Sequence, residues 1–163
     1  MKRRLQILYL TSAQTAALIR WSAFWYRCGP VGRAISIWLD NLLLALFGME
    51  VVSGSLEVKE LVVGHSTGVV LGGNGIRCSG RLHVSSGVVF ARRYNDHATL
   101  VGSPQGPMFV VDGDLTVGAN SVLLGPLSIK GPVVIGALTL VTRDITEPGV
   151  YVGCPAKKIR SIE

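Results

Sequence analysis

The last third of the chain repeats an aliphatic residue every six positions. The repeated residues share one phase, and a glycine directly follows two of them: Val111, Val117, Leu123, Ile129, Ile135 and Val141. An α-helix returns a side chain to the same face after 3.6 residues and a β-strand after two, so a period of six fits neither element alone. It is typical of a parallel β-helix of hexapeptide repeats, in which each unit points an aliphatic side chain into a three-sided prism. The pattern therefore predicts an all-β solenoid.

A second run with the same period lies upstream. Its members again share one phase, and Gly64 occupies the one position without an aliphatic side chain: Val52, Val58, Val70, Ile76, Leu82 and Val88. Between the two runs, residues 91–108 are polar, contain Gly and Pro, and have no period. This stretch predicts a loop that projects from one corner of the prism.

The beginning of the chain follows a different pattern. We predict a short α-helical N-terminal arm over residues 1–49 and a β-helix domain over residues 50–163. Helical spacing places one helix at about 12–28 and a second at about 31–47, separated by Gly29-Pro30. Asp40 and Asn41 interrupt the apolar run of the second helix, which leaves that run too short to span a bilayer.

Charge is concentrated in this arm. The segment before Asp40 contains no acid and holds six cations, enough for the whole net charge of +6: Lys2, Arg3, Arg4, Arg20, Arg27 and Arg33. The rest of the chain is balanced, so the charge gives no support to nucleic-acid binding by the body. Two compatible interpretations of the arm stay open. It caps the first coil of the solenoid, or it rests on an anionic membrane through its arginines and tryptophans.

Composition and cysteine usage narrow the class of protein. A hydrophobic content of 48% excludes a disordered chain, and 20 glycines without a collagen period suit a β architecture rich in turns. Cys28, Cys78 and Cys154 are odd in number and lack the spacing of a metal site. We therefore expect a reducing, cytoplasmic compartment, with contact at the inner membrane if the arm binds lipid.

Two segments carry a resemblance to a known family. Residues 64–72, Gly-His-Ser-Thr-Gly-Val-Val-Leu-Gly, resemble the active-site coil of serine acetyltransferases and of the related capsule and exopolysaccharide O-acetyltransferases. Residues 135–137, 141–143 and 152–160 resemble the final coils and C-terminal motif of hexapeptide-repeat acyltransferases. Together the similar pieces span roughly residues 50–160. The resemblance implies a left-handed β-helix, a homotrimer with active sites between subunits, and metal-free acetyl transfer from acetyl-CoA to a hydroxyl.

Acetyl transfer to a hydroxyl needs a base beside the acceptor oxygen, and histidine titrates in the right range. His65, in the first similar segment, is the candidate. In the resembled enzymes a carboxylate lies fifteen residues earlier, which is Glu50 here. If a turn is three hexapeptides, that position lies nearly one turn below, about 4.8 Å away along the axis and half a face aside. Glu50 would then fix the imidazole tautomer and stabilise the imidazolium.

A second histidine is a candidate for acceptor binding. His97 lies in the predicted loop, near where the resembled serine enzymes place a histidine within a Gly-Gly-Asp-Arg-His-Pro run. This chain instead has Arg-Tyr-Asn-Asp-His-Ala over residues 93–98. That departure argues against L-serine as the acceptor. The remaining histidine, His83, is expected on the outer wall of the prism.

The resemblance also implies a binding edge for coenzyme A. Small side chains let the pantetheine arm lie against the backbone, and Ala119 and Ala137 hold matching positions. Cations near the nucleotide end suit phosphate oxygens. The residues at matching positions there are Thr142, Arg143, Lys157 and Arg160.

Three functions remain open at this stage. A sugar hydroxyl of a bacterial surface or capsular polysaccharide, or of its precursor, is the favoured acceptor, because serine acetyltransferases usually carry a larger helical domain than this short basic arm. The alternatives are an L-serine O-acetyltransferase of cysteine biosynthesis and a β-helix scaffold without catalysis.

Overall fold

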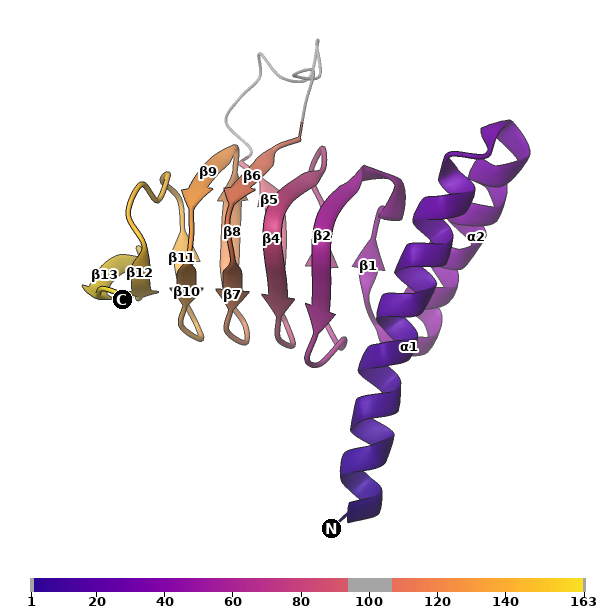
Figure 1. The fold of residues 1–163 in the computed structure, drawn as a ribbon, viewed down its shortest axis with the longest axis horizontal. Helices are drawn as coiled ribbons and strands as arrows, with labels where there is room; N and C mark the ends of the chain where they lie inside the picture. The colour runs from indigo at the N-terminus through magenta and orange to yellow at the C-terminus, as the bar shows by residue number, and fades with distance from the viewer. Residues whose placement is uncertain (1, 94–106, 163) are drawn as a thin grey trace.

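The computed structural model describes residues 2–93 and 107–162. Its parallel strands wind into a three-sided solenoid, and two helices lie across the N-terminal end (Figure 1). The helices are α1 (Lys2–Tyr26) and α2 (Gly29–Phe47), with a short 3-10 turn, η1 (Ser53–Ser55), after the first strand. The strands are β1 (Glu50–Val51), β2 (Leu56–Val63), β3 (Val70–Leu71), β4 (Ile76–Val84), β5 (Val89–Arg92), β6 (Phe109–Asp112), β7 (Leu115–Val117), β8 (Val122–Gly125), β9 (Leu127–Lys130), β10 (Val133–Ile135), β11 (Leu140–Val141), β12 (Gly149–Val152) and β13 (Lys157–Arg160).

The strands form three faces. The first face is the sheet β1-β3-β5-β8-β11. Strands β2 and β4 are long enough to turn a corner, so their first halves begin the second face, which continues with β6 and β9. Their second halves begin the third face, which continues with β7, β10 and β12. The antiparallel strand β13 pairs with β12 and covers this end of the sheet.

The C-terminal repeat is confirmed. All six predicted inward residues are at most 2% exposed: Val111, Val117, Leu123, Ile129, Ile135 and Val141. Strand pairing has the expected turn length, since Leu115 pairs with Val133, three hexapeptides later. The residue two positions before each repeat also points inward, and two of these, Ser121 and Thr139, are polar. Each hexapeptide therefore contributes two side chains to the core.

The upstream repeat is right in its later half and wrong in its first. Ile76, Leu82 and Val88 are fully buried, as predicted, but Val52 is 50% exposed, and Val58 and Val70 are only half-buried. The neighbouring residues are buried in their place: Val51, Leu56, Val63 and Val69. The cause is coil length. Glu50 pairs with Val70, two positions beyond a turn of three hexapeptides, so a single phase of six cannot persist.

The register breaks within the first coil. Pairing of β2 with β4 shifts between Val58 and Glu60. Glu57 points outward and forms an ion pair with Arg77 at 2.7 Å, while Val58 packs against the core. Leu56, and not Val58, is therefore the fully inward residue of this stretch. The predicted loop is narrower than expected at both ends, because β5 continues to Arg92 and Met108 is buried.

The helical arm covers the first coil. Ile19 of α1, Leu43 of α2 and the linking residue Met49 are at most 4% exposed and belong to the solenoid core. The first helix begins at Lys2 and not near Ser12, because the intervening Leu, Gln and Arg residues favour helix. By length and composition α2 can cross a bilayer, contrary to the expectation that its apolar run is too short, although many soluble helices meet the same test.

A polar network fastens the two helices to the solenoid. One carboxylate oxygen of Asp40 in α2 accepts hydrogen bonds from Ser22 Oγ at 2.7 Å and from Ser53 Oγ at 2.6 Å. The other accepts from the backbone N–H of Ser53 at 3.1 Å. The hydroxyls of Ser22 and Ser36 are 2.8 Å apart. All three serines are buried, so these groups depend on one another and not on water.

We expect Asp40→Ala to lower the free energy of unfolding by about 2–3 kcal/mol, because it removes the acceptor of the buried Ser53 hydroxyl and N–H and one of the partners of the Ser22 hydroxyl. Glu57→Ala is the control, since its ion pair with Arg77 is more than half exposed and such pairs contribute roughly 0–1 kcal/mol. Urea denaturation at fixed protein concentration measures both. Equal midpoints for the two variants would show that the network does not fasten the arm.

Candidate active site

The turns between the third and first faces stack into one column along the solenoid. We call this the corner column: residues 64–68, 85–87, 118–120, 136–138 and 153–156. Backbone hydrogen bonds join each turn to the next. The N–H of Gly87 donates to Thr67 O at 3.0 Å, that of Asn120 to Ser86 O at 2.9 Å, and that of Leu138 to Ala119 O at 2.9 Å. The column is therefore a continuous, backbone-supported edge.

The first four turns of the column each use one left-handed residue at the same place. Gly68 and Gly87 have φ of 71° and 66°, which glycine adopts without strain. Asn120 and Leu138 hold the equivalent positions with φ of 57°. Asn tolerates this conformation, but for Leu it is strained. Leu138 is also 73% exposed, so an apolar side chain projects from a strained backbone position of the column beside Ala137.

Two buried hydroxyls support the column from inside. Ser121 Oγ donates to Gly136 O at 2.7 Å and accepts from the Thr139 N–H at 3.2 Å. Thr139 Oγ1 in turn contacts Ala137 O and the Gly153 N–H, both at 3.3 Å. These bonds satisfy turn groups that the strand ladders leave unpaired. Sequence spacing alone did not reveal the pair, since both residues occupy positions that otherwise hold aliphatic side chains.

His65 lies exposed in the first turn of the column. Hydrogen bonds fix the backbone on both sides of it, from the Gly64 N–H to Val84 O at 2.9 Å and from the Gly68 N–H to Gly48 O at 2.8 Å. The imidazole is therefore accessible to a substrate on a rigid turn.

Glu50 begins β1 on the first face and is also exposed. Its register partner is Val70, which follows His65 along the chain, because this coil is longer than three hexapeptides. Within the described residues no hydrogen bond or ion pair joins Glu50 to His65. The pairing of the two side chains stays a prediction.

His83 lies closer to this site than the sequence indicated. It sits half-buried on the third face, paired with Val62 and Thr116. A Cβ placed on Gly64 would lie 3.1 Å from His83 Nε2, so the ring packs over the residue directly before His65. Residues 65 and 83 are three hexapeptides, or one turn, apart. This spacing could have predicted from the sequence that the two histidines lie on neighbouring coils.

Two of the candidate coenzyme A residues belong to the corner column. Ala119 is half-buried and Ala137 is exposed. Gly118 precedes Ala119 for a structural reason, because a Cβ there would lie 2.6 Å from Ala137 N. Lys157 follows the last turn of the column and pairs with Val152, so it stands at the C-terminal end of the same edge.

The other candidates lie elsewhere. Thr142 and Arg143 follow β11 at the opposite edge of the first face. Thr142 is half-buried and its carbonyl accepts a hydrogen bond from the guanidinium of Arg93, whereas Arg143 is exposed. Arg160 is exposed on β13, opposite Val150. The structure thus brings three candidates to the column and places three apart from it.

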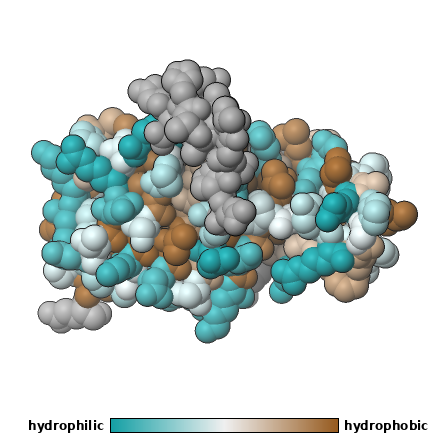
Figure 2. Space-filling model, turned by 90° about the horizontal axis from the view of Figure 1, so that it is seen from above, coloured by the Kyte–Doolittle hydropathy of each residue, from teal (hydrophilic) through white to brown (hydrophobic). Residues whose placement is uncertain are grey.

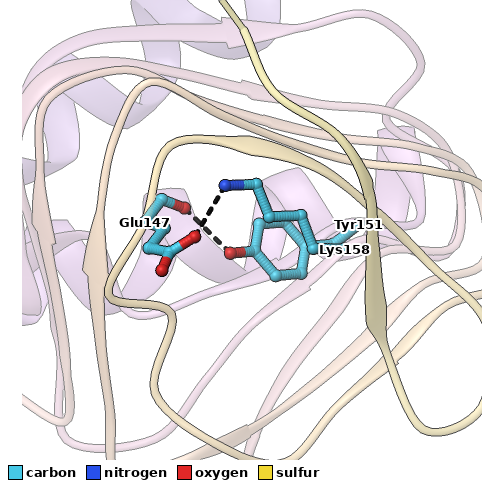
Figure 3. Close-up of polar contacts among 3 residues, drawn as sticks. All are labelled: Glu147, Tyr151 and Lys158. Atoms are coloured by element: carbon cyan, nitrogen blue, oxygen red, sulfur yellow. Dashed lines mark hydrogen bonds and ion pairs between the residues drawn. The ribbon is translucent and has the colours of Figure 1, made fainter.

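Near the C-terminus, one lysine is already engaged. Lys158 Nζ lies 2.8 Å from Glu147 Oε2, and Tyr151 donates its hydroxyl proton to the Glu147 carbonyl at 2.9 Å (Figure 3). No ion pair of Lys157 or Arg160 occurs in the described part of the chain. These two cations are therefore available to bind a phosphate. They are also the two that the resemblance assigns to the nucleotide end of coenzyme A, whereas it assigns no such role to Lys158.

The hydrogen bond from Lys158, with its charge, lowers the pKa of Glu147 below the ordinary value of 4.5. Because the folded pKa lies below the unfolded one, the pair favours the folded state at neutral pH, and its contribution is lost as pH falls through the folded pKa. We expect Lys158→Met to raise this pKa and Lys157→Met to leave it lowered. Carbon-detected NMR titration of the carboxyl measures it. An unchanged titration in Lys158→Met would contradict the assignment.

Nearly the whole chain matches solved serine acetyltransferases. The enzyme from Neisseria gonorrhoeae superposes with a TM-score of 0.73 at 23% identity, over 93% of this chain and 56% of that chain. The enzyme from Brucella abortus strain S19 in complex with coenzyme A superposes with a TM-score of 0.75 at 17% identity, over 95% and 58%. The chain has the left-handed β-helix fold of these enzymes.

Sequence comparison points the same way over a shorter stretch. The 2,3,4,5-tetrahydropyridine-2,6-dicarboxylate N-acetyltransferase of Staphylococcus aureus is 28% identical over 79 residues, which is 48% of this chain and 30% of that protein. No protein-family model matches the chain. The chain spans under a third of this curated relative and just over half of the solved proteins. The predicted fold class and the resemblance to hexapeptide-repeat acyltransferases are confirmed.

One candidate residue and the question of a metal site remain. His97 lies outside the described part of the chain, so its role in acceptor binding stays a prediction. Within residues 2–93 and 107–162, no group of three His, Cys, Asp or Glu side chains is placed to hold a metal ion.

Proposed function

We propose that the protein transfers an acetyl group from acetyl-CoA to a hydroxyl. One observation carries this proposal: 95% of the chain superposes on a serine acetyltransferase in complex with coenzyme A. The candidate base supports it, because His65 is exposed on a rigid turn of the corner column, with Ala119 and Ala137 two and three turns further along the same edge.

His65 supplies the proton transfer in this mechanism. A neutral hydroxyl is a weak nucleophile, and the imidazole accepts its proton as the oxygen attacks the thioester carbon. The proton then passes to the leaving thiolate, so the imidazole returns to its neutral form. Glu50 is the proposed stabiliser of the imidazolium. Both side chains are exposed, and the substrate complex is where we expect them to meet.

The corner column has side chains that fit a bound coenzyme A. Ala119 and Ala137 leave the backbone accessible to an extended pantetheine chain, and Lys157 stands at the end of this edge to meet phosphate oxygens. Thr142 and Arg143 lie across the first face and do not share the edge. One ligand contacts both sets only if a second copy places its opposite edge against this column. We therefore include a homotrimer with the ligand between subunits in the proposal.

For the acceptor we propose a hydroxyl of a sugar in a bacterial surface or capsular polysaccharide or its precursor. The support comes from the loop sequence, since Arg-Tyr-Asn-Asp-His-Ala over 93–98 lacks the Arg-His-Pro that the resembled serine enzymes carry. A cytoplasmic site of action is part of this proposal.

L-serine is the second candidate acceptor. The observation that favours it is the set of structural neighbours, which includes a soybean serine acetyltransferase complexed with serine, superposed with a TM-score of 0.69 at 18% identity. Those identities show the fold and do not distinguish one hydroxyl from another.

The deciding experiment measures release of free thiol from acetyl-CoA. The protein is incubated with L-serine, with sugar nucleotides, or with capsular oligosaccharides, and acetylated products are identified by mass. We expect acceptor-dependent thiol release with a sugar substrate. Release only with L-serine would replace the favoured acceptor by the second. Absence of both thiol release and coenzyme A binding would leave a β-helix scaffold without catalysis.

A further inference from the structure

The outward face of α2 carries large apolar side chains, and its inward face places polar groups beside the buried Leu43. Val31, Ile37 and Trp38 are 75%, 61% and 64% exposed. On the other side of the helix, Ser36 is buried, and Asp40 accepts hydrogen bonds from α1 and η1. A surface helix of a soluble domain normally turns its apolar residues to the core and its charges to water. In α2 several of the largest apolar side chains face outward instead, so its exposed face fits an apolar environment outside the protein.

The neighbouring helix adds large apolar side chains. Trp21 and Phe24 of α1 are 64% and 62% exposed. With Ala17 and Arg20 they line a hollow of about 460 Å³. Apolar residues are mixed with charged ones over the helical end of the molecule, at the right in Figure 2. All three tryptophans of the chain, Trp21, Trp25 and Trp38, lie in this arm.

The charge of the arm selects the kind of surface. No residue before Asp40 is acidic, and six are Lys or Arg. Arg20, Arg27 and Arg33 make no ion pair within the described residues, and Arg33 instead lies 5.6 Å from the centre of the Tyr26 ring. Cations and tryptophans beside an exposed apolar helix face are the combination that binds anionic lipid headgroups at a bilayer surface.

We propose that the α1–α2 arm docks the protein on the surface of an anionic lipid bilayer. The outward face of α2 lies in the interface between headgroups and acyl chains, and the arginines contact lipid phosphates. The solenoid then stands away from the membrane, since the helices cover its N-terminal end (Figure 1). This proposal is independent of the proposed enzyme activity.

The contacts of α2 favour a position on the surface over a transmembrane one. Leu43 is fully buried against the solenoid, and Met49, one residue after the helix C-cap, is fully buried as well. Asp40 joins α2 to Ser22 and Ser53. A helix that crossed the bilayer would have to break all of these contacts. Lying flat, it keeps them.

A second copy of the chain is the competing occupant of this face. Like charges weigh against it, because a face-to-face pair would bring the uncompensated arginines of two arms together. A bilayer containing phosphatidylglycerol instead offers phosphates to the same arginines.

The test is sedimentation of the full-length protein with vesicles, together with tryptophan emission, which reports on the arm alone. We expect binding and a shift of emission to shorter wavelength with phosphatidylcholine vesicles containing phosphatidylglycerol, and neither with pure phosphatidylcholine. Ile37→Glu/Trp38→Glu should weaken binding at least roughly tenfold. Arg20→Gln/Arg27→Gln should weaken it by roughly tenfold and reduce its salt dependence. Val110→Glu is the matched control, because Val110 is an exposed apolar residue (40%) on β6, away from the arm. This variant should bind vesicles as the wild type does.

Several outcomes would overturn the proposal. Equal binding to neutral and anionic vesicles, or none to either, excludes an anionic surface. Bound protein that alkaline carbonate does not release indicates a transmembrane helix. An oligomer whose mass halves in Ile37→Glu/Trp38→Glu, without vesicle binding by the wild type, assigns the face to a second copy. The emission shift and the arginine variant decide the matter even if the glutamate variant fails to fold.

Discussion

His65→Ala should reduce kcat by about three orders of magnitude or more while the affinity for coenzyme A stays within a few-fold. A general base typically contributes 10²–10⁴ in rate, and His65 is the proposed base for the acceptor hydroxyl. The turn that carries His65 is held by backbone hydrogen bonds at Gly64 and Gly68, so removal of the exposed side chain should leave the fold unchanged. Thiol release at saturating acetyl-CoA measures kcat, and calorimetry measures coenzyme A affinity.

Glu50→Gln should impair turnover less severely than His65→Ala, because it removes a stabilising charge and leaves the base in place. Glu57→Gln is the matched control, since Glu57 is an exposed carboxylate of the same coil that pairs with Arg77 on the second face. Unchanged rates in both His65→Ala and Glu50→Gln would defeat the dyad. A loss in Glu50→Gln matched by an equal loss in Glu57→Gln would assign the effect to the coil and not to the dyad.

Phe90→Ala should lower the free energy of unfolding by about 3–5 kcal/mol, the usual cost of removing a fully buried aromatic ring. The Phe90 ring is 0% exposed and meets Phe109 edge-on, with ring centroids 5.0 Å apart. Its strand, β5, lies in the middle of the first face between β3 and β8, so a cavity there weakens the stacking of three coils.

The control for this prediction is Phe24→Ala, the same change at a ring that is 62% exposed, with an expected cost below about 0.5 kcal/mol. Denaturant midpoints at one protein concentration compare the two variants, because the proposed subunit association would also stabilise the fold. Similar losses for Phe90→Ala and Phe24→Ala would contradict the stacked-coil core.

The sequence predicts the solenoid well where the coils are regular. From Val111 to Val141 each turn consists of three hexapeptides, so the aliphatic residues that recur every six positions are the inward side chains. It fails in the first coil, where Glu50 pairs with Val70 and the register shifts near Glu60. The first coil contains two residues more than three hexapeptides, and the strands of neighbouring coils still pair. Spacing along the sequence does not show which residue of the next coil each residue pairs with. The same extra residues displace Glu50 from the place that its spacing from His65 gave it.

The helical arm shows a second limit. Spacing found the apolar stripe of α2, which includes Val31 and Trp38, but both side chains face outward. Hydrogen bonds of Ser22 and Ser53 to Asp40 turn the polar side of the helix to the protein. Periodicity locates a stripe and does not say whether the body or the surroundings cover it.

Coenzyme A binding tests the central claim most directly, because it distinguishes an acetyltransferase from a scaffold before any acceptor is known. Calorimetric titration of coenzyme A into the wild-type protein should show saturable binding. Ala137→Trp places a large side chain on the corner column, where coenzyme A is proposed to lie, and should abolish that binding. Val110→Trp, on the second face, is the control and should retain it. Absence of binding by the wild-type protein, or full binding by Ala137→Trp, would contradict the account.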